Sequence, residues 1–178
     1  GSEMCIRDSN SLSLINWKAI EYGQDDISGI TLALSNYYRT SLNKGKNTLT
    51  VKQELSNMES YLNIQQIMHD NSFDVVMDID ENVLEYESLN LILQPLVENA
   101  IEHGIDLLTD RRGVITVVAK LHNGLIHIEV KDNGIGMPKE TAHTFLTSES
   151  GGYGARNVND RIRLFYGEQY NLKVSSDE

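Results

Sequence analysis

One predicted strand of this chain runs directly into the stretch Asp132-Asn133-Gly134-Ile135-Gly136. The preceding residues 125–130 alternate apolar and polar side chains, which is typical of a β-strand. A carboxylate followed by two spaced glycines suits a site where one hydrogen-bond acceptor meets the polar edge of a ligand, because the glycines let the backbone turn and the ligand approach closely. By itself, this pattern also fits many ordinary surface turns.

Two further segments give the stretch its weight, and all three occur in order along the chain. Upstream, residues 93–104 read LQPLVENAIEHG, and downstream, residues 151–158 read GGYGARNV. The upstream segment is apolar on most helical faces, which predicts a largely buried helix over about residues 89–103 that Pro95 kinks or delays. The downstream segment opens a predicted helix, whose free N–H groups and positive dipole end favour a phosphate.

These three segments resemble the N, G1 and G2 boxes of the ATPase superfamily shared by gyrase, heat-shock chaperone ATPases, mismatch-repair ATPases and histidine kinases. The pattern of residues 93–101 is similar to sensor histidine kinases of two-component systems, in particular the YesM- and LytS-like kinases with a short dimerisation region. The resemblance extends from Asn10 to Glu178. It implies an α+β fold, a two-layer α/β sandwich of the Bergerat ATP-binding type, preceded by an antiparallel helical hairpin.

Composition narrows the function classes. Among 178 residues, 15 are basic and 26 acidic, which gives a net charge of −11 and argues against a nucleic-acid partner, since such a binder needs a basic face. ATP stays compatible, because backbone N–H groups and a metal ion can hold its phosphates. Cys5 is the single cysteine, so an intrachain disulfide is excluded. No apolar run approaches the roughly 18–20 residues that span a bilayer, and we expect a cytoplasmic domain of a bacterial inner- or plasma-membrane receptor.

The N-terminal part predicts a leader and two helices. Residues 1–9 have no clear period and begin with Gly-Ser, which indicates a tag or non-native leader. Apolar residues at helical spacing predict helices over about residues 10–22 and 25–42, broken by Gly23. We interpret residues 10–45 as the remnant of a dimerisation and phosphoacceptor hairpin. Residues 46–178 are then the ATP-binding catalytic domain, lacking its last strand.

The remaining elements alternate in type, which predicts an α+β domain with a mixed sheet. Thr50 and Gln53 form a capping box for a helix ending near Asp70. Strands are predicted over residues 73–79, 114–121 and 125–130, with an Asn123-Gly124 hairpin turn. Residues 137–151 lack a period and predict a mobile loop, followed by a helix over 153–166 and a strand near 171–174.

The candidate magnesium ligand is Asn99, because a carboxamide oxygen is a hard ligand suited to Mg²⁺. Helical spacing puts Asn99 and His103 on one face, where both can reach the same phosphates. Glu98 lies about 100° away around the helix and could hold a water or a hydroxyl. The resemblance implies that Asn99 binds Mg²⁺ and that Glu98 assists phosphoryl transfer. Alternatively, Glu98, Glu102 and His103 form a solvated face.

Adenine offers an exocyclic amine donor, for which a fixed carboxylate is a fitting acceptor. The resemblance assigns this role to Asp132, with Gly134 and Gly136 shaping the pocket floor. The expected catalytic set is therefore Glu98, Asn99 and His103. The expected ATP-binding set consists of Asn99, His103, Asp132, Gly134, Gly136, Gly152, Tyr153 and Gly154.

One departure from the family concerns the phosphate acceptor. In the resembled kinases a histidine stands four residues before the asparagine matched by Asn10, and here that position is Ile6. The resemblance implies a kinase that transfers the ATP γ-phosphoryl group to a histidine of a homodimer and then to a response regulator receiver domain. We expect this chain to lack its own acceptor. The alternatives are a non-catalytic, anti-sigma-like ATP-binding module and a topoisomerase- or chaperone-type ATPase.

Overall fold

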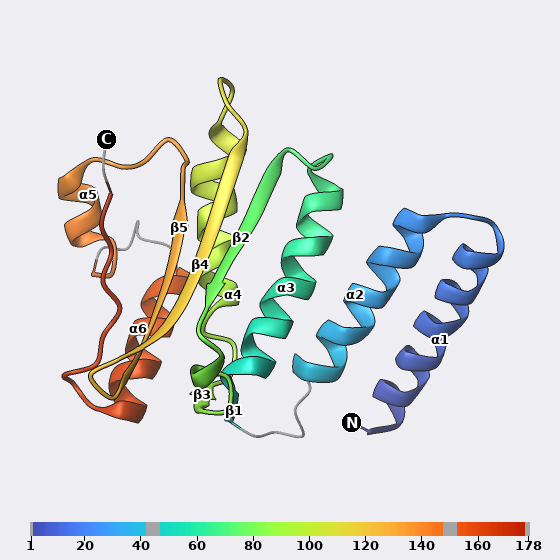
Figure 1. The fold of residues 1–178 in the computed structure, drawn as a ribbon, viewed down its shortest axis with the longest axis horizontal. Coiled ribbons are helices and arrows are strands. Elements are labelled where there is room, and N and C mark those ends of the chain that lie inside the picture. The colour runs from blue at the N-terminus through green and yellow to red at the C-terminus, as the bar shows by residue number, and fades with distance from the viewer. Residues whose placement is uncertain (1, 42–46, 148–152, 177–178) are drawn as a thin grey trace. The chain divides into compact units, whose positions relative to one another are not determined.

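The structure is a computed structural model that describes residues 2–41, 47–147 and 153–176. The chain divides into two compact units (Figure 1). The first comprises residues 1–72 and 84–90, and the second comprises residues 73–83 and 91–178. The predicted domain boundary after residue 45 stays a prediction.

The first unit begins with a helical hairpin, as the sequence predicts. Helices α1 (Ser2–Glu21) and α2 (Asp25–Ser41) run side by side (Figure 1). Gly23 ends α1 with a φ of +64°, and Ser28 Oγ donates a 2.7 Å hydrogen bond to Asn16 Oδ1 across the pair. Helix α1 starts earlier than expected, at Ser2, because good helix formers can extend a helix through a segment without an apolar period.

Helix α3 (Val51–Met68) follows, and its capping box is confirmed. Gln53 N donates to Thr50 Oγ1 at 3.2 Å, and Thr50 N donates to Gln53 Oε1 at 3.0 Å. Two short strands that the sequence did not predict, β1 (Thr48–Thr50) and β3 (Glu87–Leu89), pair antiparallel in this unit. Three-residue strands are too short to show a period, which explains the omission. The buried face of α3 is formed by Val51, Leu55, Met58 and Leu62.

The second unit is built on a three-stranded sheet of order β2-β4-β5, formed by β2 (Phe73–Ile79), β4 (Gly113–His122) and β5 (Leu125–Asp132) (Figure 1). Strand β4 pairs parallel with β2 and antiparallel with β5. Asn123 and Gly124 both have positive φ, 51° and 77°, as a type I′ turn requires. The predicted strands and hairpin are therefore confirmed, with β4 and β5 slightly longer than expected.

The two faces of this sheet differ in chemistry. The inner face carries fully buried side chains such as Phe73 and Val117. The outer face is charged: Arg112 donates two 2.7 Å hydrogen bonds to Asp74, and this lowers the pKa of the Asp74 carboxyl. Asp132 pairs with the buried Ile115 and therefore lies on the inner side, at the end of its strand.

The predicted helix over residues 89–103 is wrong in its start and in its form. It begins only at Gln94, because Leu91 has a positive φ of 55° and Pro95 suits a first turn. After α4 (Gln94–Asn99) the chain forms the π-helical segment η2 (Ala100–Gly104) and the short 3₁₀ turn η3 (Ile105–Leu107). Another 3₁₀ turn, η1 (Glu81–Val83), follows β2.

The C-terminal part holds one confirmed helix and two corrections. Helix α6 (Tyr153–Tyr166) forms as predicted. The expected loop over residues 137–151 contains a short helix, α5 (Lys139–Thr144), and its residues 148–151 lie outside the described residues. The expected strand near 171–174 is absent, because Leu172 N donates to the Asn159 side chain at 2.9 Å instead of to a strand. The whole is a mixed α/β fold with an N-terminal helical hairpin, as predicted.

Candidate functional site

The turn after β5 holds the Asp132 carboxylate in a fixed orientation. Gly134 N donates a 2.9 Å hydrogen bond to Asp132 Oδ1, which is the geometry of an Asx turn. Within the described part of the chain, Oδ2 of the same carboxylate takes no hydrogen bond. Asp132 is exposed and Gly136 has a φ of +70°, which favours glycine there. One oxygen therefore anchors the carboxylate while the other stays available to a ligand.

Two glycines bring this turn against the π-helical segment. A Cβ atom on Gly104 would lie 2.5 Å from Asp132 Oδ1, and one on Gly134 would lie 2.4 Å from the Gly104 Cα. Such distances are far inside van der Waals contact, so only glycine fits at either position. The carboxylate consequently rests directly on the backbone of η2, the segment that also carries His103.

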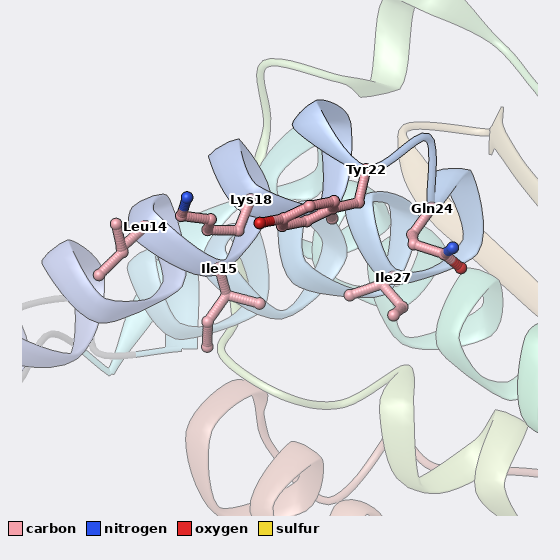
Figure 2. Close-up of a pocket in the computed structure, with 7 residues that line it drawn as sticks. Leu14, Ile15, Lys18, Tyr22, Gln24 and Ile27 are labelled. Atoms are coloured by element: carbon pink, nitrogen blue, oxygen red, sulfur yellow. The ribbon is translucent and has the colours of Figure 1, made fainter.

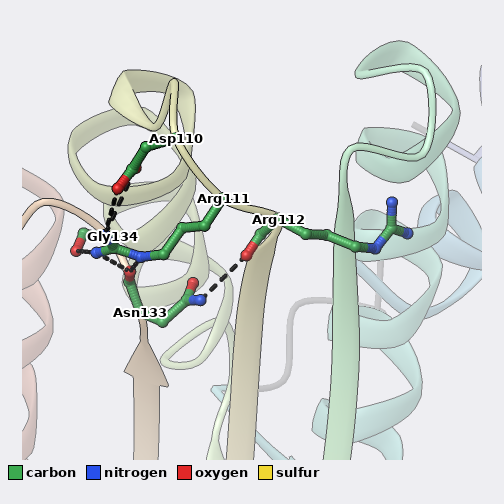
Figure 3. A network of polar contacts seen from close by, with 5 residues as sticks. All are labelled: Asp110, Arg111, Arg112, Asn133 and Gly134. Carbon is green, nitrogen blue, oxygen red and sulfur yellow. Dashed lines mark hydrogen bonds and ion pairs between the residues drawn. The ribbon is translucent and has the colours of Figure 1, made fainter.

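The turn is tied to its surroundings by side chains from two sides (Figure 3). Asn133 Oδ1 accepts a 2.7 Å hydrogen bond from Val114 N, and Asn133 Nδ2 donates to the Arg112 carbonyl at 3.1 Å. Arg111 Nη2 donates to the carbonyl oxygens of Asn133 and Gly134, at 2.9 Å each. Both the strand side and the loop before β4 therefore hold the turn.

The residues predicted from the upstream segment lie at the junction of two helix types. Asn99 is the last residue of α4 and is half-buried, whereas His103 is exposed within η2. Glu98 Oε1 accepts a 2.7 Å hydrogen bond from Gln94 Nε2. Ile105 N bonds to the Ala100 carbonyl, the i→i+5 pattern of a π-helix, so the α-helical spacing assumed for Asn99 and His103 does not apply between them. Their sharing of one face stays a prediction.

The downstream glycines meet the upstream segment at its start. A Cβ atom on Gly154 would lie 3.1 Å from Pro95 Cβ, so the first turn of α6 packs closely on the first turn of α4. Gly152 and the side chain of Tyr153 lie outside the described residues. The structure thus brings Asp132 and Gly134 against η2, and Gly154 against α4.

Sequence reasoning missed three residues that build this site. Gly104 was only the end of the upstream segment, and nothing in its pattern signals a contact with Asp132. Asn133 lies inside a common Asp-Asn-Gly turn and gave no sign of its bonds to β4. Arg111 is a loop arginine, a residue type that usually marks a solvated surface.

The described cavity of about 370 Å³ lies elsewhere, on the helical hairpin (Figure 2). None of its lining residues belongs to the three predicted boxes, so we place the candidate site by chemistry and not by volume. The cavity is lined by Leu14, Ile15, Lys18, Ala19, Tyr22, Gln24 and Ile27.

The donor set near Asn99 bears on a metal. Among the described residues there is no group of three or more His, Cys, Asp or Glu side chains that could hold a metal ion. A metal here would take most of its ligands from phosphates and water, which is how Mg²⁺ commonly binds with a nucleotide. A single carboxamide such as that of Asn99 fits this pattern. As to the membrane, no described helix is both long and apolar enough to cross one.

This fold is that of the ATPases shared by histidine kinases, gyrase and heat-shock chaperones, and the family models agree. Residues 9–73 match the model described as Histidine kinase, and residues 85–178 match Histidine kinase-, DNA gyrase B-, and HSP90-like ATPase. The chain belongs to this ATPase family and, within it, to the YesM- and LytS-like sensor histidine kinases.

Two relatives illustrate the similarity. Sensor histidine kinase YesM of Bacillus subtilis is 34% identical over 169 residues, which cover 94% of this chain and 28% of YesM. Sensor protein LytS of Staphylococcus saprophyticus is 34% identical over 154 residues, covering 83% of this chain and 26% of LytS. The chain therefore spans little more than a quarter of either relative.

A solved structure supports the fold alone. The histidine kinase domain from the Erythrobacter litoralis EL346 blue-light activated histidine kinase has a TM-score of 0.50 and 17% sequence identity. The match covers 88% of this chain and 85% of that one.

Proposed function

We propose that this chain is the ATP-binding catalytic portion of a sensor histidine kinase that passes the γ-phosphoryl group of ATP to a histidine. The acceptor's ring nitrogen forms a bond to the γ-phosphorus while the bond to the bridging oxygen breaks, and ADP leaves with the electron pair. An aspartate of a response regulator receiver domain then takes the phosphoryl group as the P–N bond breaks. Positioning and charge neutralisation supply most of the catalysis in such transfers.

The observation that carries this proposal is the anchored carboxylate of Asp132. Its Oδ1 is held by Gly134 N, and its Oδ2 can accept the exocyclic amine of adenine. The close approach of Gly134 to Gly104, together with the positive φ of Gly136, shapes the floor beneath the base. In this proposal Gly152, Tyr153 and Gly154 present the start of α6 to the phosphates.

The upstream helix supplies the proposed catalytic group. Asn99 binds the Mg²⁺ that bridges the phosphates, and His103 neighbours the same phosphates. Glu98 is half-buried and bonded to Gln94, which supports a fixed carboxylate able to take the proton that leaves the acceptor histidine. When bound, Mg²⁺ neutralises charge on the phosphates, and the protein's part is to orient them.

Replacing Asn99 by alanine should weaken the binding of Mg-ATP more than that of metal-free ATP. The reason is that the carboxamide oxygen contacts the metal and not the nucleotide. Calorimetric titrations with and without Mg²⁺ measure the two affinities. Asn63→Ala, an exposed position of α3, is the matched control. Equal losses in both titrations would remove Asn99 from the metal site.

The hairpin over residues 10–45 is proposed as the remnant of the dimerisation region, and the full-length protein as a homodimer in a membrane receptor. Three large apolar side chains on α1 support this: Leu14, Trp17 and Ile20 are 60%, 58% and 61% exposed. Exposed apolar surface of this kind marks a protein contact. The apolar groove of Figure 2 adjoins the same face.

The phosphotransfer proposal is tested with γ-labelled ATP. Because Ile6 occupies the acceptor position, the chain alone should give no acid-labile, base-stable phosphoprotein. An added hairpin domain that carries the family's acceptor histidine should become labelled. ATP binding without labelling of that domain would favour the non-catalytic, anti-sigma-like module. Robust phosphohistidine on the unmodified chain would show that the acceptor lies elsewhere.

A further inference from the structure

The loop before β4 grips the turn after β5 through one side chain. Arg111 Nη2 donates to the Asn133 and Gly134 carbonyl oxygens at 2.9 Å each, and Nε donates to the Asn133 carbonyl at 3.2 Å (Figure 3). Nη1 bonds to the neighbouring Asp110 at 3.1 Å. The fork of the guanidinium thus spans two consecutive carbonyls, a geometry that only arginine provides.

One peptide plane connects these bonds to the candidate adenine acceptor. The carbonyl of Asn133 and the N–H of Gly134 belong to the same planar peptide unit. Arg111 holds that unit by its carbonyl, and Asp132 Oδ1 holds it by its N–H. Rotation of the plane would break both bonds together, so Arg111 fixes the direction of the N–H that orients the carboxylate.

The grip of Arg111 is separate from the bonds that hold the turn to the sheet. Asn133 bonds to Val114 N and to the Arg112 carbonyl through its own side chain, and these bonds do not involve the Arg111 guanidinium. Loss of the guanidinium should therefore loosen the peptide plane without detaching the turn from β4.

We propose that Arg111 is a positioning residue for adenine recognition, acting through the Asn133–Gly134 peptide on Asp132. This inference rests on the proposed function, in which Asp132 reads the exocyclic amine. Arg111 does not touch the nucleotide in this scheme, because its donors are directed at the turn and at Asp110. Its contribution is to specificity for adenine.

The neighbouring arginine provides a matched control. Arg112 has the same charge, but its side chain bonds to Asp74 on the outer face of the sheet. Only its backbone carbonyl contacts the turn, and Arg112→Ala retains that carbonyl. An exposed ion pair of this kind contributes little to stability.

The experiment compares the dissociation constants of ATP and ITP, whose base carries an oxygen in place of the exocyclic amine. Arg111→Ala should weaken ATP by roughly three- to tenfold and leave ITP unchanged, so that discrimination between the two falls. Arg111→Lys should recover only part of the loss, since one ammonium cannot span both carbonyls. Arg112→Ala should bind as the unmodified chain does. In an Asp132→Ala background, Arg111→Ala should add no further loss.

Several outcomes would overturn the inference. Equal losses of ATP and ITP would indicate a phosphate contact, full recovery by Arg111→Lys would indicate charge alone, and an additive loss in the double variant would mean that Arg111 does not act through Asp132. If Arg111→Ala does not fold, the comparison of Arg111→Lys with Arg112→Ala decides. Equal binding of ATP and ITP by the unmodified chain would instead refute the adenine role of Asp132 itself.

Discussion

Gly134→Ala is expected to cost about 1–3 kcal/mol of folding free energy and to remove ATP binding. The new methyl group would lie 2.4 Å from the Gly104 Cα, 2.7 Å from the Gly104 carbonyl carbon and 2.5 Å from Asp132 Oδ1. Two of these atoms are backbone of the π-helical segment, so no side-chain rotation relieves the overlap. The turn must move away, and the carboxylate moves with it.

Urea unfolding and ATP titration measure the two effects on one protein. Gly29→Ala is the matched control, because a Cβ there would meet only Ile67 Cδ1, at the ordinary distance of 3.8 Å. Gly29 lies inside α2, where alanine should stabilise by roughly 0.5–1 kcal/mol. If Gly134→Ala unfolded at the same urea concentration as the unmodified chain, the close approach to Gly104 would be disproved.

Asp132→Ala is expected to weaken ATP binding by roughly ten- to a hundredfold, which corresponds to about 1.5–3 kcal/mol for a hydrogen bond to a charged group. The substitution removes both the acceptor for the adenine amine and the partner of Gly134 N. Calorimetry measures the affinity, and competition with GTP measures the specificity.

The control for this substitution is Asp78→Ala. Asp78 lies on β2 and pairs with Lys120 at 2.8 Å in an exposed ion pair, so its loss changes the net charge equally without touching the candidate site. GTP competing as well as ATP in the unmodified chain would contradict adenine recognition by Asp132.

Much of the fold could be predicted from residue patterns. The alternation over β2, β4 and β5, the Asn123-Gly124 turn and the Thr50–Gln53 capping box are local signals, and each formed as expected. The predicted strand near residues 171–174 failed because a strand exists only with a partner, and a local pattern does not supply one. The late start at Gln94 and the π-helix after Asn99 depend on Leu91 and on packing, which periodicity cannot encode.

The candidate site was predicted in its chemistry but not in its construction. Asp132 and the glycines around it were chosen for what they offer a ligand. Contacts across long sequence distances, such as Gly104 with Gly134 and Arg111 with Asn133, carry no signature in either segment alone. Such contacts become visible only when β4 brings the loop and the turn together.

The sheet order β2-β4-β5 also has a consequence for the sequence of events in folding. The β4–β5 hairpin is local and can close in about 1–10 μs. The parallel pairing of β2 with β4 must wait until the whole connection that carries α4 and η2 has been ordered. Asp132 belongs to the early hairpin and Gly104 to the late connection, so their contact is a product of the slower event. Nucleotide binding during refolding should therefore report completion of the β2–β4 crossover and not formation of the hairpin.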